Sequence, residues 1–258
     1  MNTMKYVIPI LLALCVTGRL NAQEFKVTVD NTKESELTLE NFPGELPIEG
    51  YNGTEIIIST EAGRFEPPDR AKGLKPVYGD GSDNTGIALF MEKNGNKVSF
   101  RCLLPITKSA DYRIRVPENL VLKIHRGCAQ GGETTISNMK SEVDFDGCHE
   151  VNLKNVTGPL VISTISGVVN VVFSEISKDK PISIATVSAE VDVTIPAKAG
   201  VDLEMSNVSG NMYSDFDLAT DNKNMRRVGG NSVRATLNGG GTDLKLHSVS
   251  GNIYLRKG

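Results

Sequence analysis

The chain has 258 residues, of which 39% are hydrophobic and 5% aromatic, and its formal net charge is -3. This length allows one large domain with a sizeable core, and the few aromatic residues, beside 25 glycines, favour a fold of many short strands and turns. The sequence has no concentrated basic stretch, which argues against a nucleic-acid partner.

The first 22 residues have the features of a secretory signal peptide. Lys5 supplies the positive start, Val7 to Val16 form a nearly unbroken apolar run, and Ala22 offers a small residue before a cleavage site. The apolar run is shorter than the roughly 20 residues that span a bilayer. We therefore expect cleavage between Ala22 and Gln23, and an exported mature chain that is periplasmic or displayed at the cell surface.

A lipoprotein alternative would use Cys15 as the lipid-modified residue. Leu14 directly before it is bulky for that processing, so cleavage after Ala22 is the preferred interpretation. No later stretch is apolar enough to cross a membrane, so we expect no transmembrane segment in the mature chain.

One apolar template recurs from residue 37 to the end of the chain. Apolar residues stand at its positions 0, 2, 5, 9 and 11, often with glycine at position 7. Strict copies begin at Leu37, Val151, Leu160, Ile182 and Leu244, and looser copies begin at Thr134 and Leu203. Because side chains alternate along a strand, positions 0 and 2 point to one face, as do positions 9 and 11. The template predicts two strands joined by a corner, which the residue at position 5 fills from inside and where glycine allows the turn.

The corners recur with a regular spacing. The corner glycines are Gly44, Gly158, Gly167, Gly210, Gly230 and Gly251. The last three recur at a nearly constant interval, and Gly147 and Gly127 continue the series upstream. This spacing predicts an all-β, single-domain parallel β-helix, or β-solenoid, over residues 23–258, with about 20–22 residues per coil and right-handed winding favoured. Asn211, Asn231 and Asn252, which follow the late glycines, would form a side-chain ladder along the stack.

The template is interrupted near residues 65–86. This stretch contains Pro67, Pro68 and Pro76 with several glycines and charges, which predicts a loop insertion. Residues 80–86 carry the oxygen ligands of a calcium loop but lack glycine at the sixth position and glutamate at the twelfth, so we expect a polar turn.

Several segments resemble a known family. They are the segment Leu39 to Gly44, the step Arg115-Val116-Pro117, the corner Asn155 to Pro159 and the late Val-Ser-Gly-Asn corners. In these the chain resembles the putative-adhesin family of β-helical bacterial envelope domains of unknown function, over about residues 35–258. The resemblance implies a single-domain β-helix at or near the cell envelope, and it implies no reaction and no catalytic residues.

Three cysteines remain after signal removal. Cys128 and Cys148 both follow a glycine and are separated by the length of one expected coil, so we expect them at equivalent sites on adjacent coils. They could form a disulfide, which an oxidising compartment permits, or remain as buried thiols. Cys102 is left over, and we expect it to be buried.

No catalytic, cofactor or metal motif stands out. The three histidines lack the spacing of a zinc site. Acidic residues recur at outward strand positions, namely Asp144, Asp146, Asp192, Asp202 and Glu204. Ordinary solvation explains them, although paired carboxylates in one groove could serve a β-helical polysaccharide hydrolase or lyase.

Three functional hypotheses follow. The leading one is an exported, non-enzymatic, adhesin-like envelope protein without a cofactor, with a structural or binding role toward an envelope protein or a glycan. The second is a carbohydrate-active enzyme, which predicts aligned acids along one groove. The third is an accessory subunit of an envelope sensing system, which predicts one defined protein partner.

Overall fold

The computed structural model describes residues 22–30, 32–61, 68–74, 77–79, 81–108, 110–178, 180–218 and 231–258. The expected signal peptide up to Asn21, including Cys15, and the corner glycine Gly230 lie outside these ranges. Within them the protein is all-β, with no α-helix and two short 3-10 turns, η1 (Asp69–Ala71) and η2 (Cys128–Gln130). No helix in the described ranges is long and apolar enough to span a membrane.

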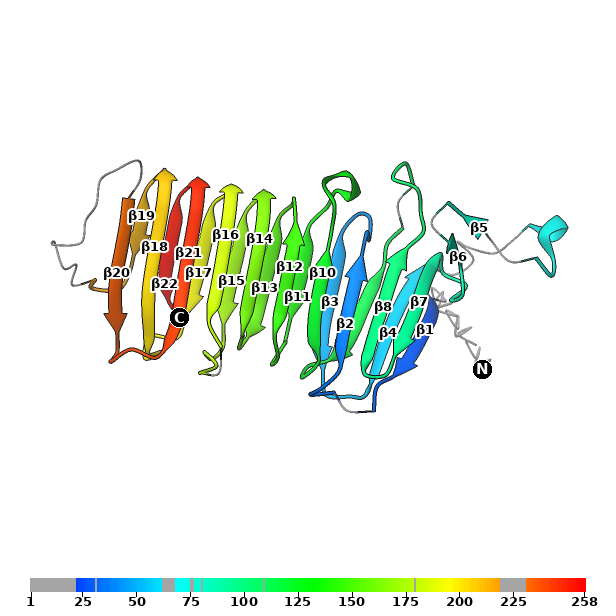
Figure 1. Ribbon diagram of the computed structural model, residues 1–258, viewed down its shortest axis with the longest axis horizontal. Helices are drawn as coiled ribbons and strands as arrows, with labels where there is room; N and C mark the ends of the chain where they lie inside the picture. The colour runs from blue at the N-terminus through cyan, green and yellow to red at the C-terminus, as the bar shows by residue number, and fades with distance from the viewer. Residues whose placement is uncertain are drawn as a thin grey trace, which may run out of the picture.

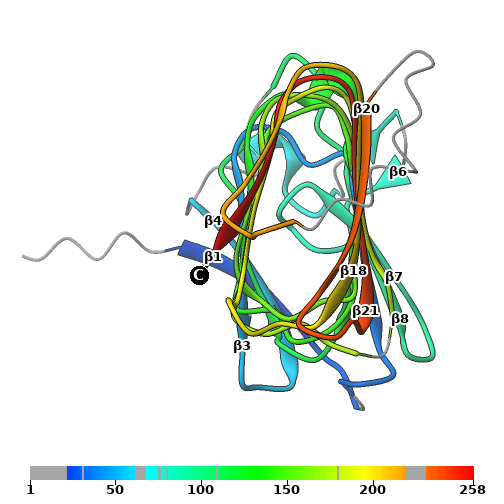
Figure 2. The same cartoon turned by 90° about the vertical axis from the view of Figure 1, so that its left-hand side faces the viewer.

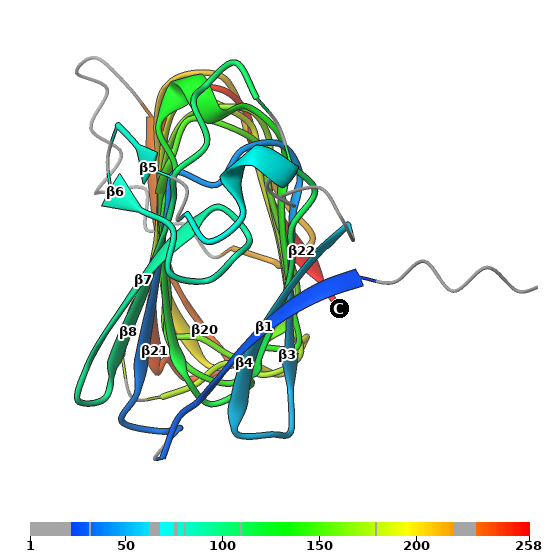
Figure 3. The same cartoon turned by 90° about the vertical axis from the view of Figure 1, so that its right-hand side faces the viewer.

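Two ten-stranded sheets form the body of the molecule. They run side by side along its long axis (Figure 1) and form the two long walls of a flattened cross-section in both end views (Figures 2 and 3). The first sheet has the spatial order β1 (Ala22–Thr28), β4 (Glu55–Glu61), β9 (Arg113–Pro117), β3 (Leu46–Tyr51), β11 (Thr134–Ser137), β13 (Val151–Val156), β15 (Val169–Phe173), β17 (Val191–Ile195), β22 (Ile253–Lys257), β19 (Met212–Ser214). The second sheet has the order β20 (Asn231–Leu237), β18 (Val201–Ser209), β21 (Thr242–Ser250), β16 (Ile182–Ser188), β14 (Leu160–Ser166), β12 (Val143–Gly147), β10 (Val121–His125), β2 (Glu36–Glu40), β8 (Lys97–Cys102), β7 (Leu89–Asn94).

The expected loop insertion stands outside both sheets. Its described part contains η1 and a small antiparallel pair, β5 (Val77–Tyr78) and β6 (Gly81–Ser82). Figure 1 shows this pair beyond one end of the two large sheets.

Most neighbouring strands pair in parallel, and their registers superpose the copies of the apolar template. One row of aliphatic side chains crosses the second sheet: Leu37, Leu122, Val143, Leu160, Ile182, Leu244 and Leu203. These side chains are all buried in the core between the sheets. Burying a side chain of this size contributes about 1.5–3 kcal/mol, so the repeated rows account for the parallel register.

The spatial order of the strands differs from the expected order along the chain. We use the word layer for one strand of each sheet joined by a corner. The last layer, β21 and β22, lies between β16–β17 and β18–β19, and the early layer β2–β3 lies between β8–β9 and β10–β11 (Figure 1). The spacing of the corners could not reveal this order, because several layers carry the same apolar template and can pair with one another.

Antiparallel strands lie at both ends of the stack. At one end β7 pairs with β8, β4 with β9 and β1 with β4, and at the other end β20 pairs with β18. The C-terminal strand β22 therefore lies inside the first sheet, between β17 and β19, and is not a free edge. This arrangement limits the unpaired strand edge that would invite aggregation.

The layers are less uniform in length than the glycine spacing indicates. Val143 pairs with Leu160, and Leu160 pairs in turn with Ile182, so the layer that begins at Val143 is clearly shorter than the next one. Gly147 pairs with Thr164 and not with Gly167. The expectation of a constant coil length is therefore wrong for this layer, because these glycines occupy different places in their corners.

The corners are of two kinds, and the expectation that position 5 points inward is correct for only one of them. Where position 4 is an asparagine with positive φ (Asn41, Asn138 and Asn155, at 60°, 60° and 55°), the alternation is broken. The next residue then turns inward, and Phe42, Met139 and Val156 are buried. Where position 4 keeps the extended conformation, the alternation continues and position 5 points outward.

Candidate functional site

The outward position 5 side chains form a straight apolar row on four adjacent layers. These residues, which we name the corner ridge, are Ile165, Val187, Val249 and Val208, and they are between 39% and 54% exposed. The register that aligns Ser166 with Ser188, and Ser209 with Ser250, places the ridge residues side by side. Large apolar side chains arranged contiguously on a surface mark a contact site more often than scattered ones do.

Buried polar side chains at position 4 lie beneath the ridge. Thr164 Oγ1 donates hydrogen bonds to the carbonyl oxygens of His149 and Ser166, at 3.2 and 3.0 Å. Ser248 Oγ donates to the carbonyl of Ala189 at 3.0 Å. Asn207, 2% exposed, ends the row, and its amide group has no hydrogen-bond partner among the described residues. The hydrogen bonds hold successive corners in register, so the ridge above them is rigid.

A disulfide lies at the same corner in the neighbouring layers. The structure joins Cys128, in η2, to Cys148, with their Cα atoms 4.9 Å apart. Ser166 Oγ donates a hydrogen bond to the Cys148 carbonyl at 2.5 Å, which links the disulfide to the first layer of the ridge. Cys102 is a buried free thiol whose pKa is raised by burial.

Reducing this disulfide is expected to lower the free energy of unfolding by about 3 kcal/mol, because the bridge closes a loop of the unfolded chain. Urea unfolding with and without dithiothreitol measures the effect. In the Cys128→Ala/Cys148→Ala double variant, dithiothreitol should change nothing. Equal stability of the oxidised and reduced wild-type protein would show that the bridge has no stabilising role.

Arg126 is a buried charged residue that the sequence pattern did not single out. It follows β10 at an inward position and is 3% exposed. Its guanidinium donates to Phe42 O at 3.1 Å and to Thr134 Oγ1 at 2.7 Å, and also to the carbonyls of Gly44, Gly131, Gly132 and Glu133. Burial lowers its pKa to about 10, so it stays charged at neutral pH. These hydrogen bonds link two corners to each other. The sequence does contain a signal for this residue, because Arg126 continues the series of inward positions Leu122 and Ile124 with a charged side chain.

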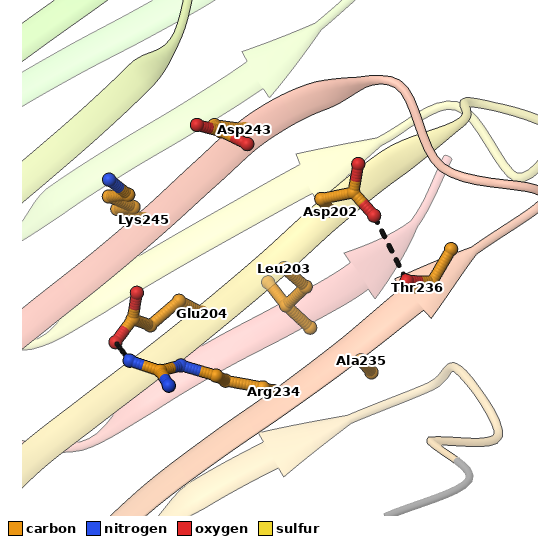
Figure 4. A pocket seen from close by; sticks show the side chains of 8 residues that line it. All are labelled: Asp202, Leu203, Glu204, Arg234, Ala235, Thr236, Asp243 and Lys245. Atoms are coloured by element: carbon orange, nitrogen blue, oxygen red, sulfur yellow. Dashed lines mark hydrogen bonds and ion pairs between the residues drawn. The ribbon is translucent and has the colours of Figure 1, made fainter.

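An open hollow of about 410 Å³ lies on the outer face of the second sheet, over β18, β20 and β21 (Figure 4). Thr236 Oγ1 donates a hydrogen bond to Asp202 at 2.9 Å, and Arg234 Nη2 forms an ion pair with Glu204 at 2.7 Å. Asp243 and Lys245 also line the hollow. Both predicted outward acids in it are therefore already engaged by a neighbouring strand.

The five predicted outward acids do not gather in one groove. Asp202 and Glu204 line the hollow, whereas Asp144 and Asp146 lie on β12 and Asp192 lies on β17 of the other sheet. No group of three or more metal-ligating side chains occurs in the ranges that the structure describes. The aligned acids that the enzyme hypothesis predicts are thus not found along one groove.

The predicted side-chain ladder of asparagines is reduced to one contact between Asn211 and Asn252. The backbone N–H of Asn211 donates to Asn252 Oδ1 at 3.0 Å, so these two residues are neighbours. Asn231 lies instead on antiparallel β20, opposite Asn207, and the three-residue ladder is wrong on this point. The physical reason is that β20 reverses direction and is not a further parallel layer.

Two other asparagine ladders occur where the sequence did not suggest them. Asn170 Nδ2 donates to Asn152 Oδ1 on the outer face of the first sheet, and Asn155 Nδ2 donates to Asn138 Oδ1 at a corner, both at 2.7 Å. Asn138 and Asn155 stand at position 4 of their copies of the template, so their signal in the sequence is an asparagine recurring at one template position. Asn152 and Asn170 stand at positions 1 and 10 of their copies and carry no such signal.

The remaining predicted corner glycines lie between consecutive strands. Gly44 and Gly158 precede β3 and β14, and Gly167, Gly210 and Gly251 precede β15, β19 and β22. In the predicted polar turn, Asp83 is buried and its carboxylate accepts backbone N–H groups of Thr85, Gly86 and Ala88 at 2.8–2.9 Å. This carboxylate is thus occupied by the turn itself.

Comparison with known proteins finds two distant structural likenesses. No protein-family model and no curated protein sequence matches the chain. The solved structure of a putative cell adhesion protein from Clostridium sporogenes ATCC 15579 is 14% identical, with a TM-score of 0.47, and the match covers 92% of this chain and 100% of that one. A putative adhesin from Parabacteroides distasonis ATCC 8503 is 8% identical, with a TM-score of 0.32, covering 91% of this chain and 97% of that one. At these values neither likeness bears on function.

Proposed function

We propose that this chain is an exported, non-enzymatic envelope protein with an adhesin-like binding role, and that its layers form a single β-solenoid domain. The parallel registers of the central layers and the shared core between the two sheets support the solenoid. The Cys128–Cys148 disulfide supports export, because structural disulfides form and persist in oxidising compartments.

The observation that carries the binding role is the corner ridge. Four branched apolar side chains in adjacent layers stay exposed although strand alternation places polar residues at most other outward positions. Their neighbours are exposed serines, Ser166, Ser188, Ser209 and Ser250, which bring no charge to the strip. A neutral, rigid and apolar strip fits a protein partner that presents an apolar strip of its own, since burying apolar surface drives most protein association.

Lysines at two ridge positions are expected to abolish this binding. The Val187→Lys/Val249→Lys variant should bind purified envelopes of the producing bacterium at least about tenfold more weakly than residues 23–258 of the wild type, since it places two charges in the apolar contact. The matched control is Val161→Lys/Val172→Lys, which changes two valines of 42% and 44% exposure on the outer sheet faces. An equal loss of envelope binding in both variants, or no loss of binding in the ridge variant, would show that the ridge is not part of the binding surface.

Digesting the envelopes with protease before the assay tests the class of partner. A protein partner predicts that binding is lost after digestion. Undiminished binding to digested envelopes would exclude a protein as the partner of the ridge.

A further inference from the structure

A stacked pair of tyrosines lies on the outer face of the first sheet, at the end where β22 and β19 pair. Tyr254 on β22 is opposite Tyr213 on β19. Their ring centroids are 5.2 Å apart and the rings are within 10° of parallel. The row continues inward along the stack with Asp192, Asn170 and Asn152. The pair therefore ends a straight line of planar polar side chains that crosses five strands.

Neighbouring polar groups hold the inner ring in place. Arg256 forms a two-pronged ion pair with Asp192, with contacts of 2.7–3.0 Å, and its guanidinium carbon lies 5.5 Å from the centre of the Tyr254 ring. Asn252 Nδ2 donates to the Tyr254 hydroxyl oxygen at 3.0 Å and to Glu190 Oε1 at 3.1 Å. The inner tyrosine is thus fixed from several directions, and a platform fixed in this way loses little entropy when a ligand binds.

Tyr213 presents the accessible side of the stack. It is 49% exposed, and β19 is the last strand of the first sheet among the described residues. Asn211 and Asp215, two positions to either side, are exposed. Tyr213 lies at the centre of β19, and Asn211 and Asp215 lie just beyond its two ends. An aromatic surface is therefore flanked by one amide and one carboxylate.

We propose that the outer face of Tyr213, backed by Tyr254, is a stacking platform for a saccharide chain. A pyranose ring has an apolar face of C–H groups, which suits an aromatic surface, and a rim of hydroxyls, which suits amide and carboxylate groups. Because the two rings are parallel and stacked, their facing sides cover each other, and the free face is the side of Tyr213 turned away from Tyr254. One sugar ring would pack on this face, with its hydroxyls toward Asn211 and Asp215.

This platform rests on the proposed binding role but uses a surface other than the corner ridge. The chain contains no tryptophan, and two of the five tyrosines within residues 23–258 form the stack, so a ligand bound there should change the intrinsic tyrosine fluorescence. Titration of residues 23–258 with cellohexaose and chitohexaose is expected to change this emission.

Calorimetric titration of three variants with the same hexasaccharides completes the test. Tyr213→Ala should bind at least about tenfold more weakly, a loss of about 1.4 kcal/mol, while Tyr213→Phe keeps the ring and should retain binding. Val161→Ala, an exposed site on the opposite sheet, is the matched control. Binding that is equal in Tyr213→Ala and the wild type, or the absence of binding and of any emission change at millimolar sugar, would overturn the platform. Envelope binding that depends on the corner ridge would persist in either case, so the two failures are distinguishable.

Discussion

Replacing Arg126 with methionine is expected to lower the free energy of unfolding by about 4 kcal/mol or more, since each buried carbonyl left without a donor costs about 1–3 kcal/mol. The side chain donates to six oxygens, five of them backbone carbonyls, from the corner after β2 and the segment before β11. Methionine fills similar volume but donates no hydrogen bond. Urea denaturation followed by circular dichroism measures the loss.

The matched control for this variant is Arg115→Met. Arg115 also lies in the first half of the chain, but its side chain is 51% exposed and contacts Glu49 at 3.5 Å. An exposed ion pair contributes about 1 kcal/mol at most, so the control should be nearly as stable as the wild type. A loss below about 1 kcal/mol in Arg126→Met would mean that water replaces the guanidinium and that the two corners do not depend on it.

The second large effect is expected from Gly210→Ala, at about 4 kcal/mol, which combines backbone strain of about 1–3 kcal/mol with a steric clash of similar cost. Gly210 has a φ of 129°, and a Cβ built on it would lie 2.2 Å from the carbonyl oxygen of Gly251 in the next layer. The neighbouring backbone cannot give way without breaking the ladder. Thermal and urea unfolding of the purified variant measure the loss.

Ala189→Gly is the matched control for the glycine variant. Ala189 occupies the same template position in the layer β16–β17, on the other side of β21–β22, where a Cβ is accommodated. Removing it should cost only about 1 kcal/mol, through the greater freedom of glycine in the unfolded chain. Equal stability of Gly210→Ala and the wild type would show that the layers of β19 and β22 do not approach as closely as the structure places them.

The sequence predicted the all-β class and the inward rows because apolar alternation is a local property. Leu160 and Ile162 point inward wherever their layer lies in the stack, so their burial required no knowledge of neighbours. The two kinds of corner were not encoded by the residue type at position 4 alone, since Asn155 with positive φ turns Val156 inward whereas Asn207, which keeps the extended conformation, leaves Val208 outside. The apolar template did not distinguish the two kinds of corner, because both carry an apolar residue at position 5.

The candidate surfaces were missed for different reasons. Tyr213 and Tyr254 belong to layers that β20 separates along the chain, and they stack because β20 pairs antiparallel with β18 and leaves β22 beside β19. The corner ridge was missed because the template took position 5 to point inward at every corner, whereas Val187, Val208 and Val249 are exposed. A repeated template makes several layers chemically equivalent partners, so the order must come from the lengths and directions of the connections.

The order of the layers is tested most directly by cross-linking across β16, β21 and β18. In the structure His247 lies between Ala185 and Ser206, paired with each. A short methanethiosulfonate cross-linker should therefore join the cysteines of Ala185→Cys/His247→Cys rapidly and those of Ala185→Cys/Ser206→Cys poorly, because the second pair is two strand spacings, about 10 Å, apart. Rapid linkage of the second pair and none of the first would show that the layers stack in the order of the chain, and would contradict the strand order of the second sheet.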